Sequence, residues 1–106
     1  MRWSALLLVA LALGGCGGES TVDAQDFGGC VRETQHPTVH TEEGVTTFIF
    51  TANGAETTAS VFPSVADAKD ALEAEARIGD AHDQRRRNVL YGGGGQAEAA
   101  IVACLS

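Results

Sequence analysis

Two histidines and two glutamates lie close together before the middle of the chain. His36 and His40 are four positions apart, and Glu42 and Glu43 follow them. Imidazole and carboxylate groups bind zinc, and an H-x-x-x-H pair on a helix would place both rings on one face. Pro37 opposes a helix here, and in an extended chain the two histidines stand about 13 Å apart. We therefore predict no metal site and interpret both histidines as polar loop and strand-edge residues.

A glycine run near the C-terminus has the composition of an anion-binding loop. Four glycines precede the last predicted helix, and three arginines precede the strand before that loop. These residues are Gly92, Gly93, Gly94 and Gly95, and Arg85, Arg86 and Arg87. Free amides at the start of a helix attract phosphate, but the Lys-Ser/Thr pair of a P-loop does not follow the glycines. The arginines should also lie about 13 Å away, at the opposite end of the strand. A flexible connector is the favoured interpretation, and a solute- or anion-binding module is the alternative.

The sequence offers no recognisable pair of a nucleophile and a base. It contains no G-x-S-x-G pattern, and Ser60 and Ser64 fall in a predicted strand and a predicted helix cap. Acidic residues recur between positions 67 and 75, where an exposed helix face explains them. We expect a protein that is not an enzyme and needs no cofactor, and a small enzyme is the least favoured hypothesis.

The first fifteen residues have the features of a secretory signal. Arg2 places a positive charge near the N-terminus, residues 5–13 contain no polar side chain, and Gly14 and Gly15 are small enough for a peptidase site. The apolar run is shorter than the roughly 20 residues that a membrane-spanning helix needs. We therefore predict that residues 1–15 are removed on export.

Leu13, Gly14, Gly15 and Cys16 resemble the lipobox of bacterial lipoproteins. In that family the cysteine thiol is lipidated, the signal is cut just before it, and the cysteine becomes the first residue. The resemblance implies a lipid on Cys16, a flexible tether over residues 16–22, and a domain over residues 23–106. The domain would be exported, lipid-anchored to the bacterial cell membrane and facing outward. An ordinary cleaved signal and an uncleaved anchor are the alternatives.

The part of the chain that follows the signal is small and acidic. Removing residues 1–15 from the 106 leaves 91, and removing Arg2 leaves 6 of the 7 Lys and Arg against 14 Asp and Glu, a net charge of −8. This charge repels nucleic acid and anionic lipid headgroups. We expect no nucleic-acid partner. The expected partners are the membrane, through the lipid, and a protein of the cell envelope, and we expect a monomer.

Two cysteines remain if a lipid occupies Cys16. Cys30 shares a predicted apolar helix stripe with Phe27 and Val31, and Cys104 lies on the apolar stripe of the last predicted helix. An even pair of cysteines in a small exported domain predicts a disulfide. Two buried reduced thiols are the alternative, and the lack of a C-x-x-C neighbour disfavours a metal site.

Apolar spacing and cap residues predict three helices, over residues 23–34, 63–78 and 96–105. Short strands are expected at 38–41 and 88–91, and residues 80–87 are interpreted as a charged connector. The strongest local signal is Asn53-Gly54 between two β-rich runs, which predicts a two-residue hairpin turn. That turn pairs Phe50 with Thr57 and Phe48 with Ala59.

These elements predict a two-layer α+β sandwich. Three or four strands, with the Asn-Gly hairpin at the centre, should be covered by helices on one face. The strand, helix and strand between residues 55 and 91 should form a right-handed crossover. The region from Phe27 to Leu105 loosely resembles small uncharacterised exported proteins of actinobacteria, a resemblance that implies no catalytic residues. The favoured function is a tethered binding or structural accessory domain of the cell envelope.

Overall fold

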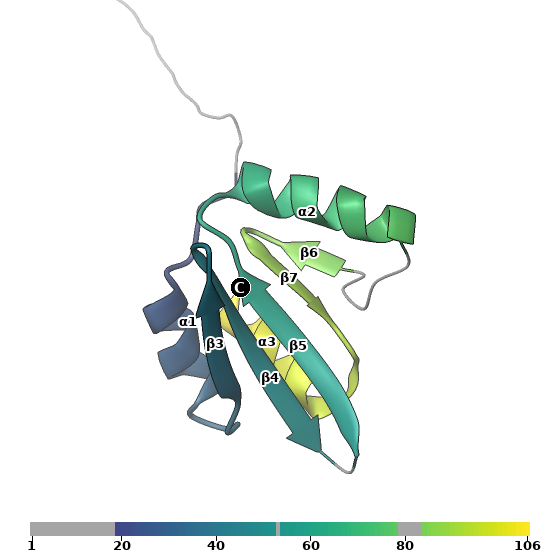
Figure 1. The fold of residues 1–106 in the computed structure, drawn as a ribbon. Helices are drawn as coiled ribbons and strands as arrows, with labels where there is room; N and C mark the ends of the chain where they lie inside the picture. The colour runs from purple at the N-terminus through teal and green to yellow at the C-terminus, as the bar shows by residue number, and fades with distance from the viewer. Residues whose placement is uncertain (1–18, 53, 79–83) are drawn as a thin grey trace, which may run out of the picture.

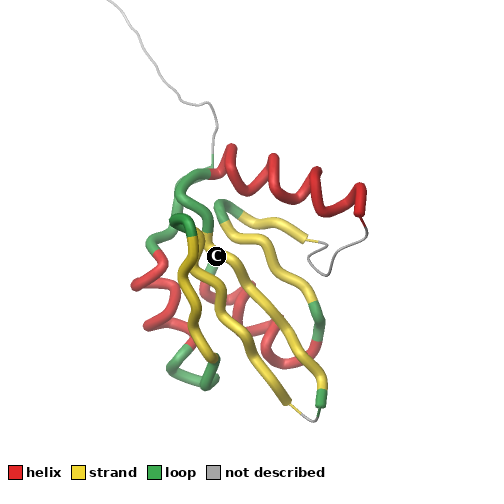
Figure 2. The backbone as a smooth tube through the Cα atoms, viewed as in Figure 1, coloured by secondary structure: helices red, strands yellow, loops and turns green. Residues whose placement is uncertain are grey.

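An antiparallel sheet and three helices make up the part of the chain that the computed structural model describes, residues 19–52, 54–78 and 84–106 (Figures 1 and 2). In chain order the elements are α1 (Ala24–Val31), β3 (Thr38–Glu42), β4 (Val45–Ala52), β5 (Ala55–Val61), α2 (Val65–Ile78), β6 (Gln84–Arg86), β7 (Val89–Gly92) and α3 (Gly95–Cys104). None of these helices has the length and apolarity that a membrane-spanning helix requires. Cys16 and the predicted signal lie outside the described residues.

The sheet has the strand order β3-β4-β5-β7-β6, and every neighbouring pair is antiparallel. The α+β class is confirmed, but the described sheet has five strands where the sequence predicted three or four. The additional strand, β6, lies in the stretch interpreted as a charged connector. It forms because this polar segment can pair its backbone with β7 at the sheet edge, where Arg86 is exposed and Arg85 pairs with Glu19.

The extra strand also changes the predicted crossover. β7 is antiparallel to β5, so these two neighbours are not the parallel pair that a crossover joins. β6 is antiparallel to β7 and therefore runs parallel to β5, with β7 between them. The chain thus runs from β5 through α2 to β6 at the sheet edge. It then turns back as β7, which pairs between β5 and β6.

The predicted hairpin is confirmed in its register. Phe48 pairs with Ala59, Phe50 with Thr57, and Ala52 with Ala55 across the turn. Alternation along the strands places Phe48 and Phe50 on the same face as Ala59 and Val61, and all four are buried.

Helices α1 and α3 cover that face and close the core. The Phe27 ring meets the edge of the Phe48 ring at a centroid distance of 5.2 Å, and Ile101 on α3 is fully buried in the same cluster. The predicted disulfide between Cys30 and Cys104 joins the two helices, with a Cα–Cα distance of 5.9 Å. It links the first helix to the last across 74 positions of sequence.

Helix α2 departs from the prediction that all helices share one face. It contacts β6 and β7 and lies across their end of the sheet in Figure 1. Leu90 lies between Val89 and Tyr91, so alternation directs it away from the main core, yet it is fully buried. Ala68 of α2 is also fully buried outside that core. A small second apolar contact therefore holds α2 on the other face, and its alanines allow it to lie close to the strands.

Candidate functional site

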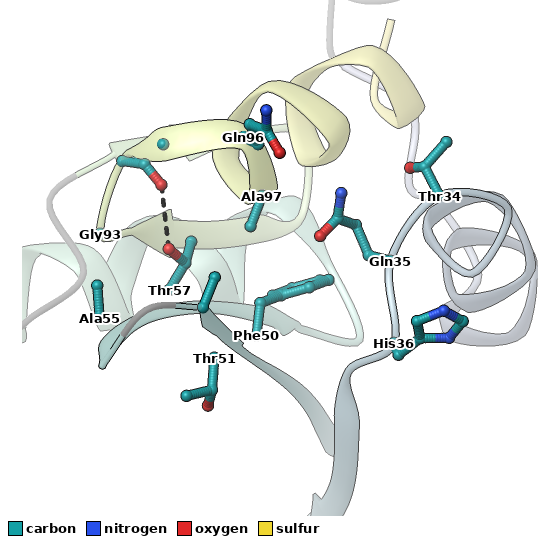
Figure 3. A pocket seen from close by; sticks show the side chains of 13 residues that line it. Thr34, Gln35, His36, Phe50, Thr51, Ala55, Thr57, Gly93, Gln96 and Ala97 are labelled. Atoms are coloured by element: carbon teal, nitrogen blue, oxygen red, sulfur yellow. Dashed lines mark hydrogen bonds between the residues drawn. The ribbon is translucent and has the colours of Figure 1, made fainter.

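A cavity of about 440 Å³ opens at the hairpin end of the sheet. It lies between the segment that follows α1, the ends of β4 and β5, and the loop that leads into α3. The residues that line it are Thr34, Gln35, His36, Phe50, Thr51, Ala52, Ala55, Thr57, Gly93, Gly94, Gly95, Gln96 and Ala97. Figure 3 shows Phe50 and Thr57 on the strands, Gln96 and Ala97 on α3, and Gln35 and His36 on the segment after α1.

The lining of this cavity mixes polar and apolar residues and contains no Asp, Glu, Lys or Arg. In a chain with 14 acidic residues this is unusual. Gln35 and Gln96 each present a carboxamide that makes no hydrogen bond with any described residue, and an amide can both donate and accept. The cavity therefore suits an uncharged ligand with several hydrogen-bonding groups.

The glycine loop that borders the cavity is fixed by contacts with β5. Gly93 has a φ of 122°, and a Cβ there would lie 2.7 Å from the Glu56 carbonyl oxygen and from the Thr57 Cα. The Thr57 hydroxyl donates to the Gly94 carbonyl over 3.0 Å, and the Gly94 amide donates to the Glu98 carboxylate over 3.2 Å. The loop that the sequence analysis interpreted as a flexible connector is thus hydrogen-bonded to a residue 37 positions away in sequence.

The arginines lie at the other end of β7 from these glycines. Arg85 and Arg86 are in β6, and Arg87 is in the turn before β7, whereas Gly92 ends β7 and the other three glycines follow it. The structure therefore does not bring the arginines and the glycine loop together. Arg85 and Arg87 instead contact the first described residues of the chain.

We call the contact between Glu19–Val22 and Arg85, Arg87 and Asn88 the N-terminal clasp. Arg85 Nη1 lies 2.6 Å from Glu19 Oε1, and the Arg87 amide donates to Glu19 Oε2 over 3.2 Å. The Arg87 guanidinium donates to the Ser20 carbonyl, the Ser20 hydroxyl and the Thr21 carbonyl over 2.9, 3.1 and 2.9 Å. The hydrogen bond from Arg85, and next the one from the Arg87 amide, lower the pKa of Glu19 below its ordinary value.

Asn88 completes the clasp from inside the protein. Only 1% of Asn88 is exposed. Its carboxamide accepts from the Val22 amide over 2.7 Å and donates to the carbonyls of Val22 and Phe62 over 3.0 and 2.6 Å. Three long-range hydrogen bonds thus join the N-terminal segment, the end of β5 and the start of β7. Residues 19–22, which the sequence analysis assigned to a flexible tether, therefore contact the folded domain.

A second cavity, of about 430 Å³, lies beside the clasp. Asp23 and Asp26 contribute to its walls. Asp23 already caps α1, because its carboxylate accepts from the amides of Gln25 and Asp26 over 3.0 and 3.3 Å. Asn88, also in the wall, has its carboxamide engaged on both sides. The first cavity, with its uncommitted amides, is the better candidate for binding.

The two histidines lie in different parts of the structure. His36 is in the wall of the first cavity, and His40 is in β3, where its Nε2 is 3.6 Å from Glu42 Oε1. Within the described ranges, no three His, Cys, Asp or Glu side chains gather as metal ligands would. Comparison of the chain with protein-family models, curated proteins and solved structures found no match.

Proposed function

We propose that the protein is an exported lipoprotein, held at the bacterial cell membrane through Cys16, and that its domain binds an uncharged, hydrogen-bonding component of the cell envelope. The observation that carries the binding role is the first cavity, with its charge-free lining and its fixed glycine loop. The Cys30–Cys104 disulfide supports export, because such bonds persist in oxidising compartments.

The proposed role is binding and not catalysis. The cavity presents amides, hydroxyls and one histidine, and it lacks the carboxylate, lysine or arginine that would tune a nucleophile or stabilise developing charge. An anion site that combines the arginines with the glycine loop is not proposed, because the two groups lie at opposite ends of β7 and Arg85 and Arg87 are engaged by the clasp.

Membrane attachment is tested by partition and mass. The wild-type protein should enter the detergent phase of a Triton X-114 separation and carry acyl mass on its N-terminal peptide. Cys16→Ser should enter the aqueous phase without that mass. A wild-type protein that stays in water and carries no acyl group would contradict the lipoprotein proposal.

Binding is tested by cross-linking the protein to its partner in intact envelope, with a variant that blocks the cavity. Ala55 lines the cavity and is exposed, so Ala55→Trp should occupy the opening without disturbing the core. Glu56→Trp is the matched control, because alternation directs position 56 to the opposite face of the same hairpin. Cross-linked material should be lost with Ala55→Trp and retained with Glu56→Trp. Equal capture by both variants would rule out the cavity as the binding site.

A further inference from the structure

The N-terminal clasp fixes the place where the chain leaves the domain. Arg87 adopts a φ of 57°, a left-handed conformation that is uncommon for a residue with a side chain. From that turn its guanidinium reaches Ser20 and Thr21, while Arg85 reaches Glu19. These contacts connect positions 66 to 68 apart in sequence. The first described residues are therefore part of the folded surface and not a free leader.

The clasp and the first cavity lie at opposite ends of the sheet. Val61, the last residue of β5, pairs with Val89, directly after Asn88 of the clasp. Ala55, the first residue of β5, lines the cavity. The 7 residues of β5 separate the two ends by about 20 Å. In Figure 1 the first described residues lie beside the start of α2, and the paired end of β4 and start of β5 lie at the far end of the sheet.

The clasp leaves very little chain between a lipid on Cys16 and the domain. Only Gly17 and Gly18 lie between Cys16 and Glu19, so the tether spans at most about 10 Å when fully extended. The headgroup layer of one leaflet is itself about 5–8 Å thick. A free tether over residues 16–22 would instead have reached about 23 Å. Almost the whole of the shortened tether is therefore used in crossing the headgroups.

We infer that the clasp end of the domain rests against the lipid headgroups of the membrane and that the first cavity faces away from it. This inference rests on the lipidation of Cys16 proposed above. The tether, and not attraction between charges, holds the domain there, because Asp67 and Asp70 flank Lys69 on the same end and the mature chain is acidic. A partner would then meet the cavity about 20 Å above the membrane surface. Such a partner is a component that stands above the bilayer and not one embedded in it.

The orientation is tested with a fluorophore at one end of the domain and a short-range quencher in the membrane. The lipidated protein is placed in vesicles of phosphatidylethanolamine and phosphatidylglycerol that contain a lipid with a nitroxide on its headgroup. Lys69→Cys puts the label at the clasp end, because Lys69 is exposed in the first half of α2 and the start of α2 lies beside the first described residues in Figure 1. Glu56→Cys puts it at the cavity end. We expect quenching at position 69 to exceed quenching at position 56 several-fold.

Two further variants separate the tether from the domain surface. Insertion of about ten Gly and Ser residues between Gly18 and Glu19 adds roughly 17 Å of average reach and leaves the fold untouched. It should reduce quenching at position 69 to the level at position 56. The double variant Arg85→Ala/Arg87→Ala should also reduce quenching at position 69, because it releases residues 19–21 from the domain. Arg86→Ala is the matched control and should change nothing, because the Arg86 side chain is exposed and makes no hydrogen bond or ion pair with the described residues.

The outcomes distinguish this inference from the proposal on which it rests. Acyl mass on Cys16 together with equal quenching at both positions would overturn the orientation and leave the lipoprotein proposal intact. Quenching at position 69 that survives the insertion would overturn the role of the tether. A mature protein without acyl mass would overturn both.

Discussion

The two ends of the sheet are built from opposite kinds of residue. The clasp end uses the long side chains of Arg85 and Arg87 and the amide of Asn88 to hold another segment of the chain, through the Glu19 carboxylate and through backbone carbonyls. The cavity end uses a glycine, Gly93, whose backbone passes within contact distance of β5. At the clasp end a side chain is required, and at Gly93 a side chain cannot be accommodated.

The difference shows how easily composition misleads about the role of a segment. A run of arginines is typical of anion binding, yet two of these three arginines bind carbonyl and carboxylate groups of their own chain. A run of glycines is typical of flexibility, yet this loop is held by Thr57 and Glu98. The partner of Arg85, Glu19, and the partner of Gly94, Thr57, both lie far away in sequence. The other partner of Gly94, Glu98, lies in the helix that follows the loop.

The largest effect should come from the bond that both ends depend on. Helix α1 begins beside the clasp and leads to the cavity wall, and α3 begins at the cavity, so the Cys30–Cys104 disulfide holds both ends to one core. For a loop closed across 74 positions, the chain-entropy relation gives about 4 kcal/mol of stability. Cys30→Ala and Cys104→Ala should each lower the urea midpoint strongly and equally, and reduction of the wild type should do the same. Variants that lose stability unequally, or retain it, would contradict the structural role of the bond.

The second effect tests the cavity end. Gly93→Ala adds a Cβ 2.7 Å from backbone atoms of β5 in a conformation that favours glycine, so we expect a loss of about 2–3 kcal/mol in the free energy of unfolding. Gly29→Ala is the control of opposite sign. Gly29 lies in α1 with open space around it, so the same substitution should stabilise the protein by about 0.5–1 kcal/mol. Thermal melting of the two variants and the wild type measures both changes in stability. A Gly93→Ala variant as stable as the wild type would show that the loop can move.

The third effect tests the clasp end. Asn88→Ala leaves the Val22 amide and the carbonyls of Val22 and Phe62 without their partner, at a cost of about 2–3 kcal/mol. Arg86→Ala, two positions away on the surface, should change stability by less than about 0.5 kcal/mol. Hydrogen exchange gives a local readout: the Val22 amide should exchange much faster in Asn88→Ala than in Arg86→Ala. Equal exchange at Val22 would indicate that the clasp is not closed in solution.

The parts of the fold predicted correctly from sequence depend on residues that are neighbours in sequence. The hairpin register follows from Asn53-Gly54 and the alternation around it, and Ser64 caps α2 by accepting from the Asp67 amide over 3.0 Å. The disulfide is the long-range feature that the sequence did predict, because each cysteine lies on an apolar helix stripe that must face the core.

The features that were missed depend on partners that the local pattern does not identify. Strand β6 is polar and only 3 residues long, so its pairing depends on the exposed edge of β7. Asn88 was interpreted only as the start of a strand, and its role depends on Val22, which is 66 positions away. The glycines were recognised as a candidate loop, but the cavity also requires Gln35 and Phe50 from other elements.

The smallest effect concerns the ion pair at the outer edge of the clasp. The pKa of Glu19 is lowered in the folded protein, so the ionised carboxylate is favoured by folding. Its contribution is present above the ordinary glutamate pKa of about 4.3 and is lost as the pH falls through the lowered value. Because the Glu19 side chain is 41% exposed, water and salt screen the interaction and the effect should be slight.

Melting curves of wild type and Glu19→Gln across this pH range measure the contribution directly. The wild type should be the more stable protein at neutral pH, and the two melting temperatures should converge in acid. Added salt should reduce the neutral-pH difference, since the pair with Arg85 is partly open to solvent. A difference that persists unchanged in acid would mean that Glu19 supports the clasp through shape or neutral hydrogen bonding alone. In that case the Arg87 guanidinium and Asn88 would hold the N-terminal segment without the ion pair.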